Sequence, residues 1–489
     1  MNQMRLKTRS SNDLTIIAIA ALATVAYFCC ALAQRGPVAV PDVPAYLSIA
    51  QWIYGGLPLE QNNFNPGYGL LLIPVGWLSG DSLHTAALLF NSCLAGSSIL
   101  LVARLAYAVG LSKRLTVGIT AVAAVCPSVA GAALIAWPEI LITTVLLLVA
   151  NLLAVGSPRS IKWCGFLAGS IVSVHPRAVT LAIAFMALAF IYRWWKPLAF
   201  GLLPGAVLSA FLMTLTHTWP QQRVTAIQDI GEGPSPLAVA SGQVIGIFGA
   251  SGGLALVGLL AGLFSLCRTR RHKPDNAAAE FIALSGTGMI VLGALALAGS
   301  DRSDTLLYSR YMEPWLLPLV VVGLMIVMRD FLSRRAVFVG LVLTTGALVC
   351  VLSSSAKVSI EARQIMTLSL SPVWEIFDGN INPVAIFCFC LGCTGLLLAR
   401  KKSCLRYLVA LIIILAVALP ATILNQIHLY EVGKVANGQT MMATSVDHEE
   451  RCLSYDSKTV KSYAPALYRL QLPRMSHRMY DLETGNKPC

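Results

Sequence analysis

The sequence predicts an all-α integral membrane protein with about thirteen transmembrane helices. Of its 489 residues, 56% are hydrophobic and only 12% are charged, and the mean hydropathy is +0.71. Soluble domains carry about 25% charged residues, so this composition excludes the soluble classes. Apolar runs approaching the roughly 20 residues that cross a bilayer recur along the whole chain. Short basic clusters separate many of these runs.

The apolar runs define the predicted spans. They cover residues 14–34, 85–109, 115–134, 139–155, 163–174, 178–192, 197–215, 241–266, 277–299, 313–328, 336–352, 383–399 and 407–424. The two short spans at 163–174 and 178–192 form a hairpin that meets at His175-Pro176-Arg177. We interpret the first segment as a span rather than a cleaved signal peptide because a structured loop follows it.

The basic residues orient the chain. They fall in clusters that occupy alternate loops, which is the positive-inside pattern. The clusters are Arg5, Lys7 and Arg9; Lys113 and Arg114; Arg159 and Lys162; Arg193 and Lys196; Arg268, Arg270, Arg271 and Lys273; Arg329, Arg334 and Arg335; and Arg400, Lys401, Lys402 and Arg406. The pattern predicts a cytoplasmic N-terminus, and an odd number of spans then puts the C-terminus outside. We therefore attribute the net charge of +13 to basic residues that orient the chain in the membrane and contact anionic lipids. We expect no nucleic-acid partner.

Polar residues concentrate in the predicted external loops. These loops are 35–84, 216–240, 353–382 and the tail 425–489, whereas the cytoplasmic loops are mostly short. We expect a transmembrane domain over residues 1–424 and a small external domain over 425–489. Of the 13 cysteines, Cys452 and Cys489 lie in that tail. An oxidising compartment favours a disulfide between them, and two free thiols are the alternative.

The first external loop, residues 35–84, contains a predicted helix from Pro44 to Tyr54. Its apolar residues recur with helical spacing at Tyr46, Ile49, Ala50 and Ile53, and Gly55-Gly56 ends it. This spacing predicts an amphipathic helix lying on the membrane interface. The run Asn65-Pro66-Gly67 is typical of a turn, after which the partly apolar residues 68–78 dip back towards the membrane.

Two carboxylates come at predicted helix starts on the external side. Asp42 precedes Val43-Pro44, a favourable N-cap and first turn, and Glu139 follows Pro138, where an acid complements the helix dipole. Beside these helix-capping roles, both acids could have a role in catalysis or metal binding. Because the connection before Glu139 is short, the two acids are expected at one depth. There they could form a base and its orienting group, or ligands for Mg²⁺ or Mn²⁺, for which one acid pair is a weak signal.

Two arginines lie on the same predicted face. Arg177 follows His175-Pro176, and Arg310 lies between Tyr308 and Tyr311, with Glu313 as a candidate salt-bridge partner. An arginine at an interface can simply extend its charged head into water. A guanidinium also forms bidentate bonds with phosphate oxygens and stays charged. Two arginines on the face that carries both acids favour phosphate binding.

Together these residues resemble the GT-C superfamily of integral-membrane glycosyltransferases. That superfamily includes the protein mannosyltransferases, the aminoarabinose transferases of lipid A and the mycobacterial arabinofuranosyltransferases. The resemblance covers residues 14–195 and the region of Arg310. It rests on Asp42 in PDVPAY, the helix that ends in Gly-Gly, the turn at Asn65-Pro66-Gly67 and the pair Pro138-Glu139. Many members carry Asp-Glu in the first loop, whereas Val43 follows Asp42 here.

The resemblance implies a glycosyltransferase of the cell envelope, expected in the bacterial plasma membrane and acting on its external face. Its donor would be a sugar linked to polyprenyl phosphate, and its acceptor a glycan, a lipid or a protein. Transfer needs a base for the acceptor hydroxyl and positive charge for the leaving phosphate. Asp42 is the expected base, Glu139 a second acid or metal ligand, and Arg177 and Arg310 the phosphate ligands. Tyr46, Asn65, His175 and Tyr311 are weaker candidates for sugar contacts.

Two other functions compete with this one. A multi-span transporter or lipid-linked-sugar flippase would use the external loops as a gate, but it predicts ionisable residues deep in spans and polar loops on both faces. An enzyme resembling an O-antigen ligase or polymerase would take a diphosphate-linked glycan instead.

Overall fold

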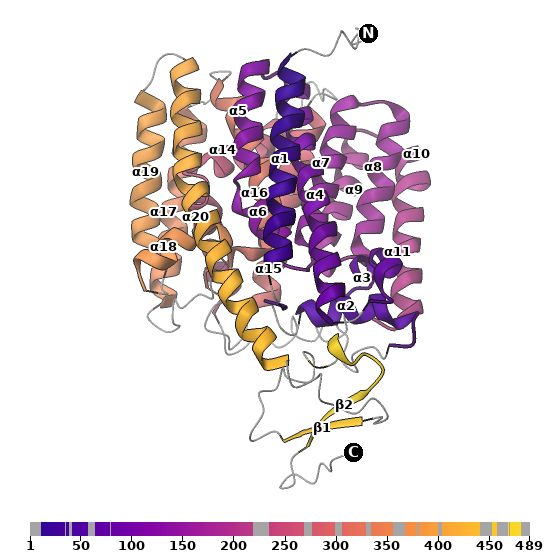
Figure 1. The fold of residues 1–489 in the computed structure, drawn as a ribbon. Helices are drawn as coiled ribbons and strands as arrows, with labels where there is room; N and C mark the ends of the chain where they lie inside the picture. The colour runs from indigo at the N-terminus through magenta and orange to yellow at the C-terminus, as the bar shows by residue number, and fades with distance from the viewer. Residues whose placement is uncertain are drawn as a thin grey trace.

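The computed structural model describes most of the chain. The described residues are 11–34, 36–38, 42–56, 64–78, 80–218, 234–267, 276–298, 306–328, 334–355, 367–378, 381–399, 403–440, 452–456, 468 and 470–480. They form a bundle of helices that run mostly along one axis, and the first helix, α1, begins at one end of it (Figure 1). Two short helices, α2 (Asp42–Trp52) and α3 (Gly67–Leu71), lie at the opposite end, beyond which the two strands lie. We refer to this opposite end as the α2 end.

The bundle helices follow the predicted spans. In chain order they are α1 (Ser11–Ala33), α4 (Gly80–Ala108), α5 (Lys113–Ala124), α6 (Pro127–Ala133), α7 (Glu139–Val155), α8 (Pro158–Ser170), α9 (Val179–Ile191), α10 (Trp195–Pro197), α11 (Leu203–Leu215), α13 (Pro236–Gly249), α14 (Leu254–Cys267), α15 (Ala277–Leu297), α16 (Glu313–Met328), α17 (Arg334–Ser355), α19 (Pro383–Ala399) and α20 (Ser403–Thr440). Among the described residues, five helices are long and apolar enough to cross a bilayer, or seven with two bent pairs. The count of about thirteen crossings stays a prediction.

The predicted single span at 241–266 is wrong as one helix. The structure has α13 and α14 there, and the two helices bend by 115° at their break. Gly252 and Gly253 lie in this break with φ of +56° and +93°, a left-handed conformation that glycine adopts without steric cost. The apolar run is continuous through the break, so hydropathy alone could not locate it.

The last helix is longer than its predicted span. The predicted boundary between the transmembrane domain and the tail, at 424/425, falls inside α20, which continues to Thr440. Asn425 is buried there, and its amide donates to the Leu368 carbonyl at 2.8 Å and accepts from the Ser371 hydroxyl. These bonds hold α20 against the short elements η8 (Leu368–Leu370) and α18 (Ser371–Ile376).

In the tail, strands β1 (Cys452–Asp456) and β2 (Ser476–Tyr480) pair in parallel. Cys452 is disulfide-bonded, as predicted. Its predicted partner, Cys489, lies outside the described residues, so the identity of the pair stays a prediction.

The helix of the first loop is more buried than predicted. Every residue of α2 from Val43 to Gln51 is buried, and exposure begins only at Trp52. The helix is therefore covered on its polar side as well as on its apolar side, and its place at the membrane interface stays a prediction. The physical reason is that α3 and η1 (Ile73–Val75) fold back over α2, and glycines allow the backbones to touch. A Cβ on Gly69 would lie 2.5 Å from the Tyr46 carbonyl oxygen.

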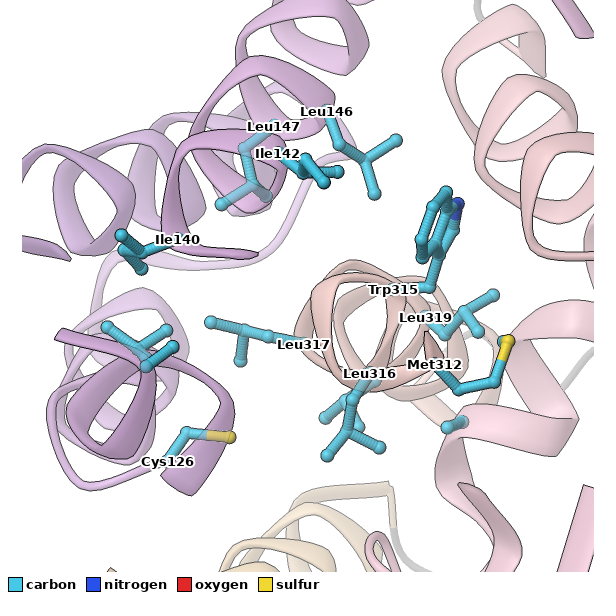
Figure 2. Packing of buried hydrophobic residues seen from close by; sticks show 14 of the residues in the cluster. Cys126, Ile140, Ile142, Leu146, Leu147, Met312, Trp315, Leu316, Leu317 and Leu319 are labelled. Carbon is cyan, nitrogen blue, oxygen red and sulfur yellow. The ribbon is translucent and has the colours of Figure 1, made fainter. Parts of the chain in front are cut away.

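The core fixes the start of α7 beside the start of α16. Buried side chains from α7, among them Ile140 and Leu147, face Leu317 and its neighbours on α16 (Figure 2). Trp315 of α16 is fully buried in the same layer and donates its indole N–H to the Ser285 hydroxyl at 2.9 Å. Rigid packing here holds the first residue of α7 next to the segment that precedes α16.

We expect Gly69→Ala to destabilise the protein by about 1–3 kcal/mol, because the new methyl group overpacks the contact between α3 and α2. Thermal unfolding of the purified protein in detergent measures the effect. Gly392→Ala in α19 is the matched control, since a Cβ there meets no atom within 4 Å. Equal melting temperatures for the two variants would contradict the packing described.

Candidate functional site

Glu139 is the centre of a buried ionic cluster at the α2 end. It is the first residue of α7 and only 2% exposed. Its Oε1 accepts a hydrogen bond from Arg310 Nε at 2.7 Å and lies 2.6 Å from Arg177 Nη2. The N-terminus of α7 adds a favourable dipole for the carboxylate. One carboxylate oxygen therefore joins two arginines that are far apart in sequence.

Arg310 extends the cluster to the first loop. It lies in η6 (Ser309–Tyr311), and its Nη1 donates to Asp42 Oδ2 at 2.9 Å. Its Cζ lies 3.8 Å from the centroid of the Trp137 ring, a cation–π contact. Burial acts to lower the pKa of Arg310, but the attraction of Glu139, with Tyr308 and Asp42, holds that pKa well above its ordinary value. The guanidinium thus stays charged although it is buried.

Arg177 has unused hydrogen-bond donors. It lies in η3 (Pro176–Ala178) and is 3% exposed. Its Nη2 forms the ion pair with Glu139, but the contact does not meet hydrogen-bond geometry, and Nε and Nη1 have no hydrogen-bond partner. The guanidinium carbon lies 5.0 Å from the centroid of the Tyr311 ring. Buried, unsatisfied N–H groups are costly, and these point to an acceptor-rich ligand.

Asp42 is the member of the cluster that meets solvent. Its side chain is 26% exposed, against 2% for Glu139 and 6% for Arg310. As the first residue of α2 it is held by the helix start, and Arg310 fixes one of its two oxygens. The four side chains carry two negative and two positive charges, so a bound anion would make the site net negative unless a proton or cation accompanies it.

The predicted turn in the first loop supports the segment that carries Arg177. The side chain of Asn65 donates to the Val172 carbonyl, and a Cβ on Gly67 would lie 2.7 Å from the Ser173 hydroxyl oxygen. His175 then accepts the Arg177 backbone N–H at its Nδ1, at 3.2 Å. These contacts fix the backbone that leads into Arg177.

The weaker sequence candidates divide into two groups. Tyr311 lies against Arg177, within the cluster. Tyr46 is buried, and its ring contacts those of Phe64 and Tyr68. Glu313, the candidate partner of Arg310, instead accepts hydrogen bonds from the backbone and the hydroxyl of Ser369, so that alternative is wrong.

The described residues offer a poor metal site. No group of three or more His, Cys, Asp or Glu side chains comes together among them. Asp42 and Glu139 both bind Arg310, which occupies the position that a cation would share. The Mg²⁺ or Mn²⁺ role of these two acids stays a prediction.

Two aromatic residues of the site were missed in the sequence. Trp137 lies under Arg310, and the Tyr308 hydroxyl accepts from Arg310 Nη1 at 3.5 Å. Each stands two residues before a charged member of the cluster, Glu139 or Arg310. An aromatic residue two positions before one of the few charged residues could have identified both of them in the sequence.

The fold is similar to crystal structures of ArnT from Cupriavidus metallidurans. The apo structure has a TM-score of 0.55 and 18% identity, over 96% of this chain and 86% of that chain. The structure bound to undecaprenyl phosphate has a TM-score of 0.53 and 15% identity over the same shares. The apo oligosaccharyltransferase of Archaeoglobus fulgidus has a TM-score of 0.50 and 13% identity, over 95% and 64%. These proteins are GT-C glycosyltransferases.

The chain has the GT-C fold. The resemblance inferred from the short motifs is thus confirmed at the level of the fold, and the protein is an integral membrane protein. No family model matches the sequence, and no curated protein matches it. In this GT-C fold the ionic cluster lies where α7, η3, η6 and α2 meet.

We expect Glu139→Gln to destabilise the protein by about 3–5 kcal/mol, because two buried guanidinium groups lose their shared counter-ion. Denaturant unfolding in detergent, compared with the exposed control Glu375→Gln, measures this loss. Adding Arg177→Gln should recover part of it, since one of the uncompensated charges is then removed. Strict additivity of the two changes would contradict the shared ion pair.

Proposed function

We propose that the protein is a glycosyltransferase that moves a sugar from a polyprenyl-phosphate donor to an acceptor hydroxyl. The observation that carries this proposal is the buried Arg177 with unpaired N–H donors, joined through Glu139 and Arg310 to the more exposed Asp42. The GT-C fold supports it, because ArnT of the same fold has been crystallised with undecaprenyl phosphate. The apolar bundle offers a surface for the isoprenoid chain.

In the proposed reaction Asp42 acts on the acceptor hydroxyl, and Arg177 acts on the leaving phosphate. Asp42 accepts the proton of the acceptor hydroxyl while the hydroxyl oxygen forms a bond to the anomeric carbon. The bond from that carbon to the phosphate oxygen breaks, and its electron pair leaves with the polyprenyl phosphate. Attack opposite to the leaving group inverts the anomeric configuration.

The departing phosphate gains negative charge, and arginine is suited to stabilise it. Arg177 has free donors for phosphate oxygens, and a charged guanidinium binds them strongly. Arg310 is already engaged with Glu139 and Asp42, so its contribution is to hold Asp42 in position and to add positive charge nearby. In this proposal Arg177 binds the phosphate directly, and Arg310 adds positive charge to the phosphate site from its place between Glu139 and Asp42.

The active face is proposed to be external. Lys113 and Arg114 begin α5 at the end of the bundle opposite to α2 (Figure 1), and positive charge favours the cytoplasmic side. The disulfide at Cys452, on the strand pair at the α2 end, fits an oxidising compartment. The proposed location is the bacterial plasma membrane, with a glycan, a lipid or a protein as acceptor.

We expect Asp42→Asn to lower sugar transfer by about 10²–10⁴-fold, the usual contribution of a positioned base. The assay supplies membranes with lipid-linked sugar donor and measures labelled product at equal protein level. Binding of undecaprenyl phosphate should change little, because Arg177 is intact. Asp81→Asn is the matched control, an exposed acid in the first turn of α4.

Transfer by Asp42→Asn at the wild-type rate would contradict the assignment of the base. A wild-type protein that moves a lipid-linked sugar across vesicle membranes, yet never passes it to an acceptor, would instead identify a flippase. Preference for a diphosphate-linked donor would favour the ligase-like or polymerase-like alternative.

A further inference from the structure

Gln243 is a buried amide without a partner. It lies in α13, is fully buried, and neither its Nε2 nor its Oε1 forms a hydrogen bond. An amide removed from water without new hydrogen bonds destabilises the protein. Such a group in a native structure calls for a ligand or an ordered water that satisfies it.

Gln243 faces the segment that carries Arg310 and Tyr311. Gly242 and Gly246, before and after Gln243 in α13, allow the helix to pack closely against the segment that carries Arg310. A Cβ on Gly242 would meet the Leu306 carbonyl oxygen, and a Cβ on Gly246 would lie 3.1 Å from the Ser309 Cβ. The turn of α13 that carries Gln243 therefore packs against the segment that leads into Arg310.

Gly293 of α15 places the amide beside the Tyr311 ring. A Cβ on Gly293 would lie 2.6 Å from Gln243 Nε2 and 3.1 Å from Tyr311 Cδ2, so both groups pack closely against this glycine. The same Tyr311 ring lies 5.0 Å from the Arg177 guanidinium. The Tyr311 ring is thus a common neighbour of the glycine that Gln243 packs against and of the Arg177 guanidinium.

We propose that Gln243 hydrogen-bonds a hydroxyl of the donor sugar and so determines which sugar the enzyme accepts. This inference rests on the proposed function, in which Arg177 binds the phosphate that carries the sugar. A hydroxyl both donates and accepts, as does a primary amide, whereas phosphate oxygens only accept and the isoprenoid chain does neither. The sugar is the part of the donor whose chemistry matches Gln243.

The test separates the sugar from its lipid carrier. Gln243→Leu is compared with the wild-type protein for affinity to undecaprenyl phosphate without sugar, and for KM and kcat with undecaprenyl-phosphate glucose, mannose and arabinose. The affinity for the sugar-free lipid should stay within about twofold. The KM for the preferred sugar donor should rise roughly tenfold or more, and discrimination among the sugars should fall, because a site built to bind a hydroxyl loses that contact.

Two further variants guard against a purely structural effect. Asn151→Leu in α7 removes another buried amide, one that donates to the Leu101 and Leu147 carbonyls, and should change stability without changing sugar preference. Gly293→Ala keeps Gln243 but displaces its amide, so it should raise KM for the sugar donor in the same way.

Unchanged KM and sugar preference in both Gln243→Leu and Gly293→Ala would overturn the inference. So would an equal loss of affinity for the sugar-free lipid, since the amide would then serve the carrier or the fold. A wild-type protein that transfers none of these sugars and does not bind the lipid would overturn the proposed function itself, which is a distinguishable result.

Discussion

The structure depends on one buried carboxylate. Charges are rare in this chain, and a charge removed from water is stable only when it is paired. Glu139 meets this constraint by sharing one oxygen between Arg177 and Arg310, and Arg310 in turn holds Asp42. Segments that begin α2, α7 and α16 are thereby tied together at one end of the bundle. Removing the shared oxygen would leave Arg177 without this ion pair and Arg310 with its contact to the more exposed Asp42.

The charged residues of the site could be predicted because each is an ionisable residue in an otherwise apolar part of the sequence. Asp42 interrupts apolar sequence in the first external loop. Glu139, Arg177 and Arg310 do so at or near the ends of predicted spans, on the same predicted face. Helix starts and span order were enough to suggest a common depth for the two acids, and the structure brings them to the same guanidinium. Their catalytic and phosphate-binding roles rest on chemistry and stay proposals.

Three features of the structure could not be predicted from the spacing of apolar residues: the break between α13 and α14, the burial of α2 and the role of Gln243. The break between α13 and α14 lies in an unbroken apolar run, where only Gly252-Gly253 marked a change of direction. The burial of α2 depends on α3 folding over it, and the spacing of apolar residues does not report what covers the other face. Gln243 is a single amide inside an apolar helix. It becomes a candidate for sugar binding only because the fold brings it close to Tyr311, which is 68 positions later in the sequence.

A structure of the protein in a lipid bilayer with undecaprenyl phosphate bound would show whether Arg177 binds the phosphate. We expect phosphate oxygens within hydrogen-bond distance, about 3 Å, of Arg177 Nε or Nη1, the two nitrogens that have no hydrogen-bond partner in the structure. The Glu139–Arg310–Asp42 contacts should persist in that complex. A phosphate bound away from Arg177, or at the end of the bundle opposite to α2, would contradict the account.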